Sequence, residues 1–465
     1  MTSFLPNDVW LVVGDFIEDQ KDRLNLIFVC RHFHDLFLRV LYRSATLKGW
    51  TETRSFLGAI LRRPELARAV RDLDFHRWKP VAASDGGNPA SPDMSLFADW
   101  AKAVSHSEEE HRQWNGDLEI GAGDAWVALL LPLLSNLHQL RLAYPKKELY
   151  LSRTLQRAMN GEKPFDTQPA FRLLREASLN HLDEGHDEKS NYLPSQILPF
   201  FRFPSMRSIS ADSVIEHQTV DVETNGKVTS QPLMGSSSID EISLSSSNGR
   251  QGMESLITSC SSLKSFKYQH TDSHALAEGY QPSAFYQSLA GSKNSLETLW
   301  LDSYGQHHTF TAAGLNESHD EWFGSLVDFT ALKDIRIRLP NLLDIRYQSE
   351  PSSPLTDILP SSLESLYVEG CKENNLSTLL SQLEVVIKNR QSRFPSLTRL
   401  DVEGFFHDEE DYEDSGYDAS TAGEKCIKPR VYETSETLRT TCENAGIEFH
   451  LRDRIVADTM IGSPA

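Results

Sequence analysis

The chain has 465 residues and a formal net charge of −20, which argues against a nucleic-acid-binding protein because such proteins present a net basic face. It contains no apolar run long enough for a transmembrane helix, and it opens without the basic and apolar segments of a signal peptide. Its five cysteines are scattered and odd in number, which is typical of reduced thiols in the cytoplasm or nucleus.

Residues 5–42 predict three short helices. Pro6 lies where the first helical turn begins, a position that favours proline. Apolar residues recur at helical spacing in each segment and give each helix one apolar face. So small a unit buries little surface and is only marginally stable alone. The recurring residues are Val9, Val13, Phe16 and Ile17, then Leu24, Ile27 and Phe28, then Phe33, Phe37 and Leu41.

The same region contains Leu5, Pro6, Asp8, Val9, Val13, Ile17, Leu24, Leu26 and the run Val29-Cys30-Arg31. Together these residues resemble an F-box, a helical module that docks on the Skp adaptor of cullin-RING ubiquitin ligases. Segments 41–47 and 63–70 resemble F-box proteins from filamentous fungi, although Phe33 stands where the family often has Trp. The resemblance implies an adaptor-binding face formed by Leu5, Pro6, Val9, Val13, Ile17, Leu24 and Leu26.

An alternative is that residues 5–42 cap the repeats that follow, with the same apolar residues facing inward. A divided face, with some residues packed inward and others outward, is a third arrangement. Exposure distinguishes these cases, because an adaptor-binding face is open to solvent whereas a cap is packed against residues 50–61.

The next elements alternate between strand and helix. We expect a strand at 44–47, a helix at 50–63 and a strand at 70–75. Residues 79–123 break this rhythm and predict a partly disordered insertion with one short helix at 94–104. Residues 126–134 predict an apolar helix that is broken or kinked at Pro132.

An L-x-x-L-x-L pattern recurs along the rest of the chain, as in Leu296, Leu299 and Leu301. Chance alone gives roughly 25 such matches in a chain of this composition. However, the first positions from Leu137 onward lie 24 to 37 residues apart, and Ser or Asn precedes most copies. A fixed period of this size indicates a solenoid. The copies begin at Val70, Leu137, Leu174, Met206, Ile239, Leu263, Leu296, Leu332, Leu363 and Leu397.

These repeats predict an α/β fold, a leucine-rich-repeat-like solenoid with parallel strands on a concave face and helices on a convex face. We place a helical F-box-like domain at 1–47, the solenoid at 48–453 and a tail at 454–465. Polar or acidic insertions are expected near 79–123, 216–238 and 405–425. Convex helices are expected at 253–260, 282–289, 322–329, 376–387 and 433–445, with a last strand at 447–451.

The sequence shows no catalytic motif and no cysteine or histidine cluster with metal-ligand spacing. We therefore expect a protein that is not an enzyme and has no cofactor or metal. The concave face is the best candidate for target binding, through exposed Trp300, Arg336, Arg338 and Tyr367, because such residues are enriched at interface hot spots. Alternatively, these side chains stack on one another and merely cover the sheet.

The pattern as a whole predicts a substrate-recognition subunit of an SCF-type ubiquitin ligase, located in the cytoplasm, the nucleus or both. Its partners would be the Skp adaptor, cullin through that adaptor, and an unknown target protein, with neither nucleic acid nor membrane. The main alternative is a repeat scaffold without a ligase role. An enzyme is a third possibility, and it would require a polar cleft with converging titratable groups.

Overall fold

The computed structural model describes residues 6–17, 19–75, 94–144, 149–167, 171–181, 192–216, 234–270, 280–303, 320–345, 350–404, 406 and 427–453. Twelve strands follow sequence order in the sheet, β1 to β12. The chain divides into two compact units, one formed by residues 1–212 with 237–239 and one by the remainder.

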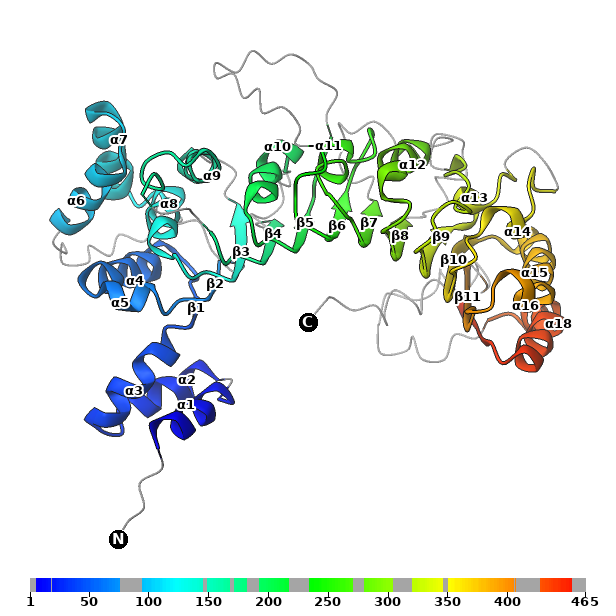
Figure 1. Ribbon diagram of the computed structural model, residues 1–465, viewed down its shortest axis with the longest axis horizontal. Helices are drawn as coiled ribbons and strands as arrows, with labels where there is room; N and C mark the ends of the chain where they lie inside the picture. Colours follow the sequence, from blue (N-terminus) through cyan, green and yellow to red (C-terminus); the bar gives the residue numbers. More distant parts are fainter. Residues whose placement is uncertain are drawn as a thin grey trace, which may run out of the picture. The chain divides into compact units, whose positions relative to one another are not determined.

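Three helices open the first unit: α1 (Asn7–Asp15), α2 (Gln20–Ile27) and α3 (Arg31–Leu41), as predicted from the apolar spacing. Both α1 and α2 pack on α3 (Figure 1). Gly14 allows the close approach of α1, because a Cβ at this position would lie 2.7 Å from a ring carbon of buried Phe37. Asp19 caps α2 by accepting a hydrogen bond from the Lys21 backbone N–H.

The first unit continues as alternating strands and helices. Leu73, Leu140, Ala177 and Ile209 lie in register on neighbouring parallel strands, and all four are buried. The strands are β1 (Ser44–Thr46), β2 (Asp72–Asp74), β3 (Gln139–Tyr144), β4 (Glu176–His181) and β5 (Ser208–Asp212). The helices after β1 are α4 (Trp50–Arg62), α5 (Pro64–Ala67), α8 (Gly123–Leu130), α9 (Tyr150–Asn160) and α10 (Pro194–Ile197).

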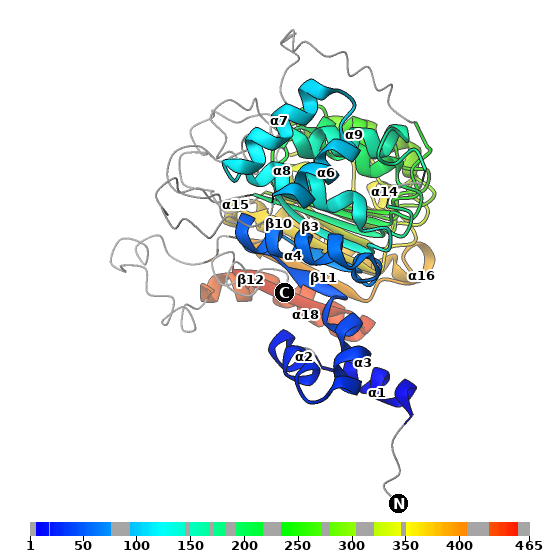
Figure 2. The ribbon, with the colours of Figure 1, turned by 90° about the vertical axis from the view of Figure 1, so that its left-hand side faces the viewer.

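The predicted insertion is more ordered than its sequence indicated. In its described part, residues 94–123, α6 (Ser95–Val104) matches the expected helix, but α7 (Glu108–Glu119) was not predicted. Trp114 of α7 packs against Tyr150, with ring centroids 4.0 Å apart. Helices α6, α7, α8 and α9 gather together (Figure 2). The insertion therefore extends the helical layer of the first unit.

The second unit repeats the same plan with longer strands. Leu299, Ile335, Leu366 and Leu400 are in register on parallel strands and are almost fully buried. Burial of each stabilises the fold by about 1.5–3 kcal/mol. The strands are β6 (Glu241–Ser247), β7 (Ser265–His270), β8 (Thr298–Ser303), β9 (Asp334–Arg338), β10 (Ser365–Cys371), β11 (Arg399–Gly404) and β12 (Glu448–Asp453). The helices are α11 (Glu254–Ile257), α12 (Pro282–Leu289), α13 (Leu339–Leu342), α14 (Leu355–Ile358), α15 (Glu373–Lys388), α16 (Arg390–Arg393) and α18 (Pro429–Ala445).

Most predicted helices are present, but the prediction of a helix at 322–329 is wrong. The chain at 322–329 is not helical, because its backbone donors are used elsewhere: Phe323 N–H donates to the Asn341 carbonyl and Leu326 N–H to the Ile358 carbonyl. Helix α11 is shorter than expected. The predicted break at Pro132 is confirmed, since α8 ends at Leu130 and a 3-10 turn follows over Leu131–Leu133.

In five of the copies, the polar residue before the repeat has a structural role. Its side chain donates a hydrogen bond to a backbone carbonyl of the preceding repeat, which ties neighbouring coils together. Asn136 donates to the Arg68 carbonyl at 2.7 Å, and Ser295 donates to the Leu263 carbonyl at 2.8 Å. The same bond is made by Ser205, Ser238 and Ser362.

Candidate protein-interaction surfaces

The N-terminal helices expose seven large apolar side chains, which we together term the apolar patch. Phe16 is 80% exposed and Phe28 is 76% exposed, although both belong to residue types that folding normally buries. Large apolar side chains that share an exposed surface mark an interaction site, and Val9, Val13 and Phe16 share one face of α1. The exposed residues are Val9, Val12, Val13, Phe16, Leu24, Phe28 and Val29.

Three of the seven residues assigned to adaptor binding, Val9, Val13 and Leu24, belong to this patch. Pro6, Val9, Val13 and Leu24 are exposed, while Ile17 and Leu26 are half-buried. Leu5 lies outside the described residues. Val12, Phe28 and Val29 also belong to the patch, and the sequence had not singled them out as contacts. The exposure of Val9 and Val13 contradicts the expectation for an inward-facing cap.

Polar contacts fix how α1 and α2 are held. Arg23 Nε donates to the Ile17 carbonyl at 2.7 Å, and Arg43 forms an ion pair with Asp15 at 2.6 Å. Gln20 Nε2 donates to the Leu41 carbonyl at 3.2 Å. After α3, the ring of Tyr42 stacks on Phe56 of α4 with centroids 5.5 Å apart. These contacts hold in place the helices whose exposed side chains form the apolar patch.

The strand face of the second unit gathers aromatic and charged side chains. Register places Lys267, Trp300, Arg336, Tyr367 and Asp401 side by side on β7 to β11. The Lys267 ammonium lies 3.9 Å from the Trp300 ring centroid, and Trp300 Nε1 donates to an Asp334 carboxylate oxygen at 2.7 Å. The Arg336 guanidinium lies 4.6 Å from the Tyr367 ring centroid.

The expectation that Arg336 and Arg338 are exposed on this face is wrong, since each is only 8% exposed. Arg336 Nε pairs with the buried carboxylate of Glu369 at 3.1 Å, and Arg338 pairs with Asp320 at 3.1 Å. A buried charge is tolerated when it is paired in this way. Trp300 and Tyr367 are half-buried rather than open.

Other ionisable groups on this face are also held by neighbours. Burial raises the pKa of the Tyr367 hydroxyl, and the Glu403 carboxylate that accepts its hydrogen bond raises it further. Burial alone would raise the pKa of Asp401, but hydrogen bonds from Arg399 and Arg452 lower it overall. Most ionisable side chains named on the strand face thus pair with one another. This arrangement agrees with the alternative that these side chains stack on one another and cover the sheet.

A model of the leucine-rich repeat domain family matches residues 48–426. The chain belongs to the leucine-rich repeat family. A search of curated proteins found no match. Leucine-rich repeat domains are typically interaction modules rather than enzymes, which agrees with the predicted solenoid and with its binding role at this coarse level. The matched region begins after α3.

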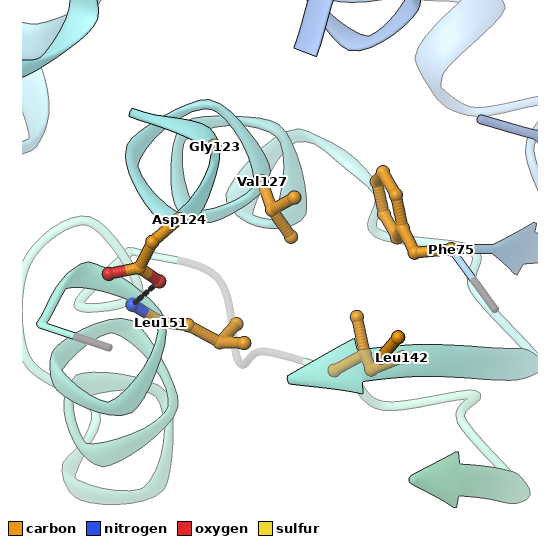
Figure 3. A pocket seen from close by; sticks show the side chains of 7 residues that line it. Phe75, Gly123, Asp124, Val127, Leu142 and Leu151 are labelled. Carbon is orange, nitrogen blue, oxygen red and sulfur yellow. Dashed lines mark hydrogen bonds between the residues drawn. The ribbon is translucent and has the colours of Figure 1, made fainter. Parts of the chain in front are cut away.

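One small pocket lies inside the leucine-rich repeat domain, between α8, β3 and α9 (Figure 3). Its side chains are mostly apolar, and Asp124 points away from them toward the start of α9. The Asp124 carboxylate accepts backbone N–H groups of Leu149, Tyr150 and Leu151 at 2.6 to 2.9 Å. Burial nevertheless raises the pKa of Asp124. This carboxylate joins two helices and has the geometry of a structural contact.

The described residues contain neither a metal-binding cluster nor a membrane-spanning helix. Among them, no group of three or more His, Cys, Asp or Glu side chains is placed to hold a metal ion. In the same part of the chain, no helix combines the length and apolar character needed to cross a membrane.

Proposed function

We propose that this leucine-rich repeat protein is a substrate-recognition subunit of an SCF-type ubiquitin ligase. Helices α1 to α3 would hold the Skp adaptor, and through it cullin, while the repeats would hold a target protein. The chain would contribute positioning rather than a nucleophile, since holding reactants together converts a bimolecular step into an effectively unimolecular one. Such a complex would operate in the cytoplasm or nucleus.

The observation that carries this proposal is the apolar patch. Val9 and Val13 lie one helical turn apart on α1, and Phe16 continues the same surface. Apolar area contributes roughly 25 cal/mol per Å² when a partner covers it. Pro6, Val9, Val13 and Leu24 are exposed, and all four are positions at which the sequence resembles an F-box. With the half-buried Ile17 and Leu26, we assign them to adaptor contact, and we add Phe16 and Phe28.

Capture of the protein by the purified, immobilised Skp adaptor tests this assignment. The wild type should bind, and Val9→Asp/Val13→Asp should lose at least about tenfold in affinity, because two carboxylates would have to be desolvated at the interface. Ile120→Asp is the matched control, since Ile120 is as exposed as Phe16 but lies at the end of α7. The absence of wild-type binding, or an equal loss in the control, would count against the proposal.

A second candidate function is an interaction scaffold without a ligase role. It is favoured by the family match, which covers the repeats and begins after the N-terminal helices. In that case the apolar patch would bind some other protein, and the immobilised adaptor would not retain the wild type. The capture experiment therefore separates the two candidates.

A further inference from the structure

Five strands of the first unit are each preceded by a basic residue. The backbone links these residues into one row: Arg71 N–H donates to the Arg43 carbonyl at 2.8 Å, and His138 N–H donates to the Arg71 carbonyl at 2.7 Å. The row continues across Arg175 and Arg207 with the same bonds at 2.8 Å. Neighbouring members are therefore about 4.8 Å apart. We term this row, Arg43, Arg71, His138, Arg175 and Arg207, the amino-end ridge.

The loops leading into these strands add further positive charge. Arg68 and Arg172 lie in them, Arg202 ends the 3-10 helix Leu198–Arg202, and all three are exposed. Across residues 42–43, 68–71, 135–138, 171–175 and 202–207 there are seven arginines and one histidine, and no Asp or Glu. In the chain as a whole, acidic residues outnumber basic ones by 66 to 46. The ridge is therefore basic, although the protein as a whole is acidic.

Two ridge arginines are available to a ligand. Arg71 and Arg175 are exposed, and within the described residues neither guanidinium makes an ion pair or a hydrogen bond. The other members have partners: Arg43 pairs with Asp15, the His138 ring with the Asn136 carbonyl, and Arg207 with the Ser238 carbonyl.

The nearest acidic residues in sequence do not neutralise the ridge. Asp72 and Glu176 each follow a ridge arginine, but successive side chains of a strand point to opposite faces. Their carboxylates accept hydrogen bonds from Ser44 and Gln139, both at 2.8 Å. Neither carboxylate is therefore paired with Arg71 or Arg175.

The equivalent row of the second unit is different. There Asp240, Lys264, Glu297, Lys333 and Glu364 occupy the position before β6 to β10 and are joined by the same backbone bonds, while the uncharged Thr398 and Ile447 precede β11 and β12. Lys264 pairs with Asp240 at 3.3 Å, and Lys333 pairs with Glu297 at 3.2 Å. Acidic and basic side chains alternate and pair, so this row carries little net charge. The repeat backbone alone does not require a basic row.

We propose that the amino-end ridge binds an extended segment of a partner protein that is rich in Asp and Glu. This deepens the proposed function and rests on it, because the segment would belong to the target. Arg43 and Arg207 are four strand spacings apart, about 19 Å, which an extended peptide covers with about six residues at ~3.3 Å each. A guanidinium fork matches a carboxylate in geometry and charge.

The overall charge favours a short acidic segment over a long polyanion. A nucleic-acid duplex or an anionic membrane would bring many negative charges toward a protein of net charge −20, and its repulsion would extend beyond the ridge. A short peptide brings only the few carboxylates that the ridge can pair.

Fluorescence anisotropy with the full-length protein tests this assignment at low ionic strength. The probe is a labelled peptide of about eight alternating Glu and Ser residues, long enough to span the ridge, and its Gln/Ser counterpart is the neutral control. The acidic peptide should bind and the neutral one should not. Binding should weaken as salt rises from about 50 to about 200 mM, because exposed charges are screened.

Paired substitutions locate the site. Arg71→Ser/Arg175→Ser should weaken binding of the acidic peptide by about tenfold or more, and Arg71→Lys/Arg175→Lys should recover part of it. Lys264→Ser/Lys333→Ser is the matched control: it also removes two positive charges from the same register position, and it should change binding by less than about twofold.

Three results would overturn the assignment: no binding of the acidic peptide by the wild type, equal losses in the two serine variants, or tighter binding of an RNA duplex or of anionic phospholipid vesicles than of the peptide. Adaptor capture is measured in parallel with the same variants and should be unchanged. Failure of peptide binding with intact adaptor capture would count against this inference alone, whereas the reverse result would count against the proposed function.

Discussion

The two units share one backbone plan and differ in how their side chains satisfy one another. In the second unit, strand-face residues such as Arg336 and Glu369 are buried and paired, and the row before the strands is joined by ion pairs. In the first unit, the row before the strands is basic throughout, and Arg71 and Arg175 remain exposed. The repeat backbone therefore fixes the positions of the side chains. The identity of the residues at these positions decides whether the side chains pair with one another or remain free to contact a partner.

The largest loss of stability is expected when the buried ion pair of the second unit is broken. Glu369→Ala would leave Arg336 buried without this carboxylate, which should lower the free energy of unfolding by about 3–5 kcal/mol. Glu364→Ala, at an exposed position just before the same strand, should change it by less than about 0.5 kcal/mol. Urea denaturation measures both. A loss below about 1 kcal/mol for Glu369→Ala would show that the pair is not needed for stability.

The shared core should respond alike in both units. Leu140→Ala and Leu366→Ala each remove a fully buried side chain from the register row, and each should cost about 2–5 kcal/mol. Urea unfolding of the two variants gives the comparison. A large cost in one unit with little cost in the other would show that the cores differ, and not merely the surfaces.

One carboxylate in the helical layer of the first unit, Glu110, makes the stability of the fold depend on pH. Burial alone would raise the pKa of Glu110, but hydrogen bonding and charge from Arg157, with Arg153 nearby, lower it from 4.5 to about 2. The folded-state pKa lies below the unfolded-state value. Between about pH 2 and pH 4.5 the unfolded chain therefore binds more protons than the folded chain, and stability rises with pH. The contribution is complete above about pH 4.5 and is lost as pH falls toward 2.

Glu110→Gln tests this contribution. The variant should be less stable than the wild type by about 1.5–3 kcal/mol at neutral pH, and the difference should narrow as pH falls below 4.5. Exposed Glu119→Gln, on the same helix, is the control and should track the wild type. Unfolding followed by circular dichroism across the pH range gives both curves. A difference that stays constant with pH would contradict the assignment.

The smallest expected effect concerns the serines that join neighbouring repeats. Ser205→Ala in the first unit and Ser295→Ala in the second should each cost about 1 kcal/mol, the usual net value of one hydrogen bond. Ser396 precedes a repeat but makes no such bond among the described residues, so Ser396→Ala should fall within about 0.5 kcal/mol of wild type. Thermal unfolding ranks the three variants.

Much of the fold could be predicted because each strand repeats one local pattern. Every strand expected from the apolar triplets is present, since two of the three positions point into the core. Helix α7 was missed because its first turn, Glu108 to Glu110, reads as a solvated charge run. The apolar residues at 322–329 fit helical spacing, yet Phe323, Leu326 and Phe329 are buried from an irregular backbone. Periodicity alone does not distinguish these cases.

The candidate surfaces were less predictable because they depend on neighbours distant in sequence. Arg336 was expected to be exposed, but register places it beside β10, where Glu369 pairs with it. Val12 and Val29 are exposed through the way three helices pack, which composition does not reveal. The amino-end ridge was not predicted, because recognising it required the observed strand starts. Arg71 directly precedes β2 at Asp72, whereas the strand was expected from residue 70.

The central claim is that one chain presents two separable surfaces, the apolar patch and the amino-end ridge. The most direct test is calorimetric titration of the purified Skp adaptor into wild type, Val9→Asp/Val13→Asp and Arg71→Ser/Arg175→Ser. We predict that the adaptor binds the wild type and the arginine variant equally, and the valine variant at least about tenfold more weakly. Absence of heat with the wild type, or an equal loss in both variants, would contradict the claim.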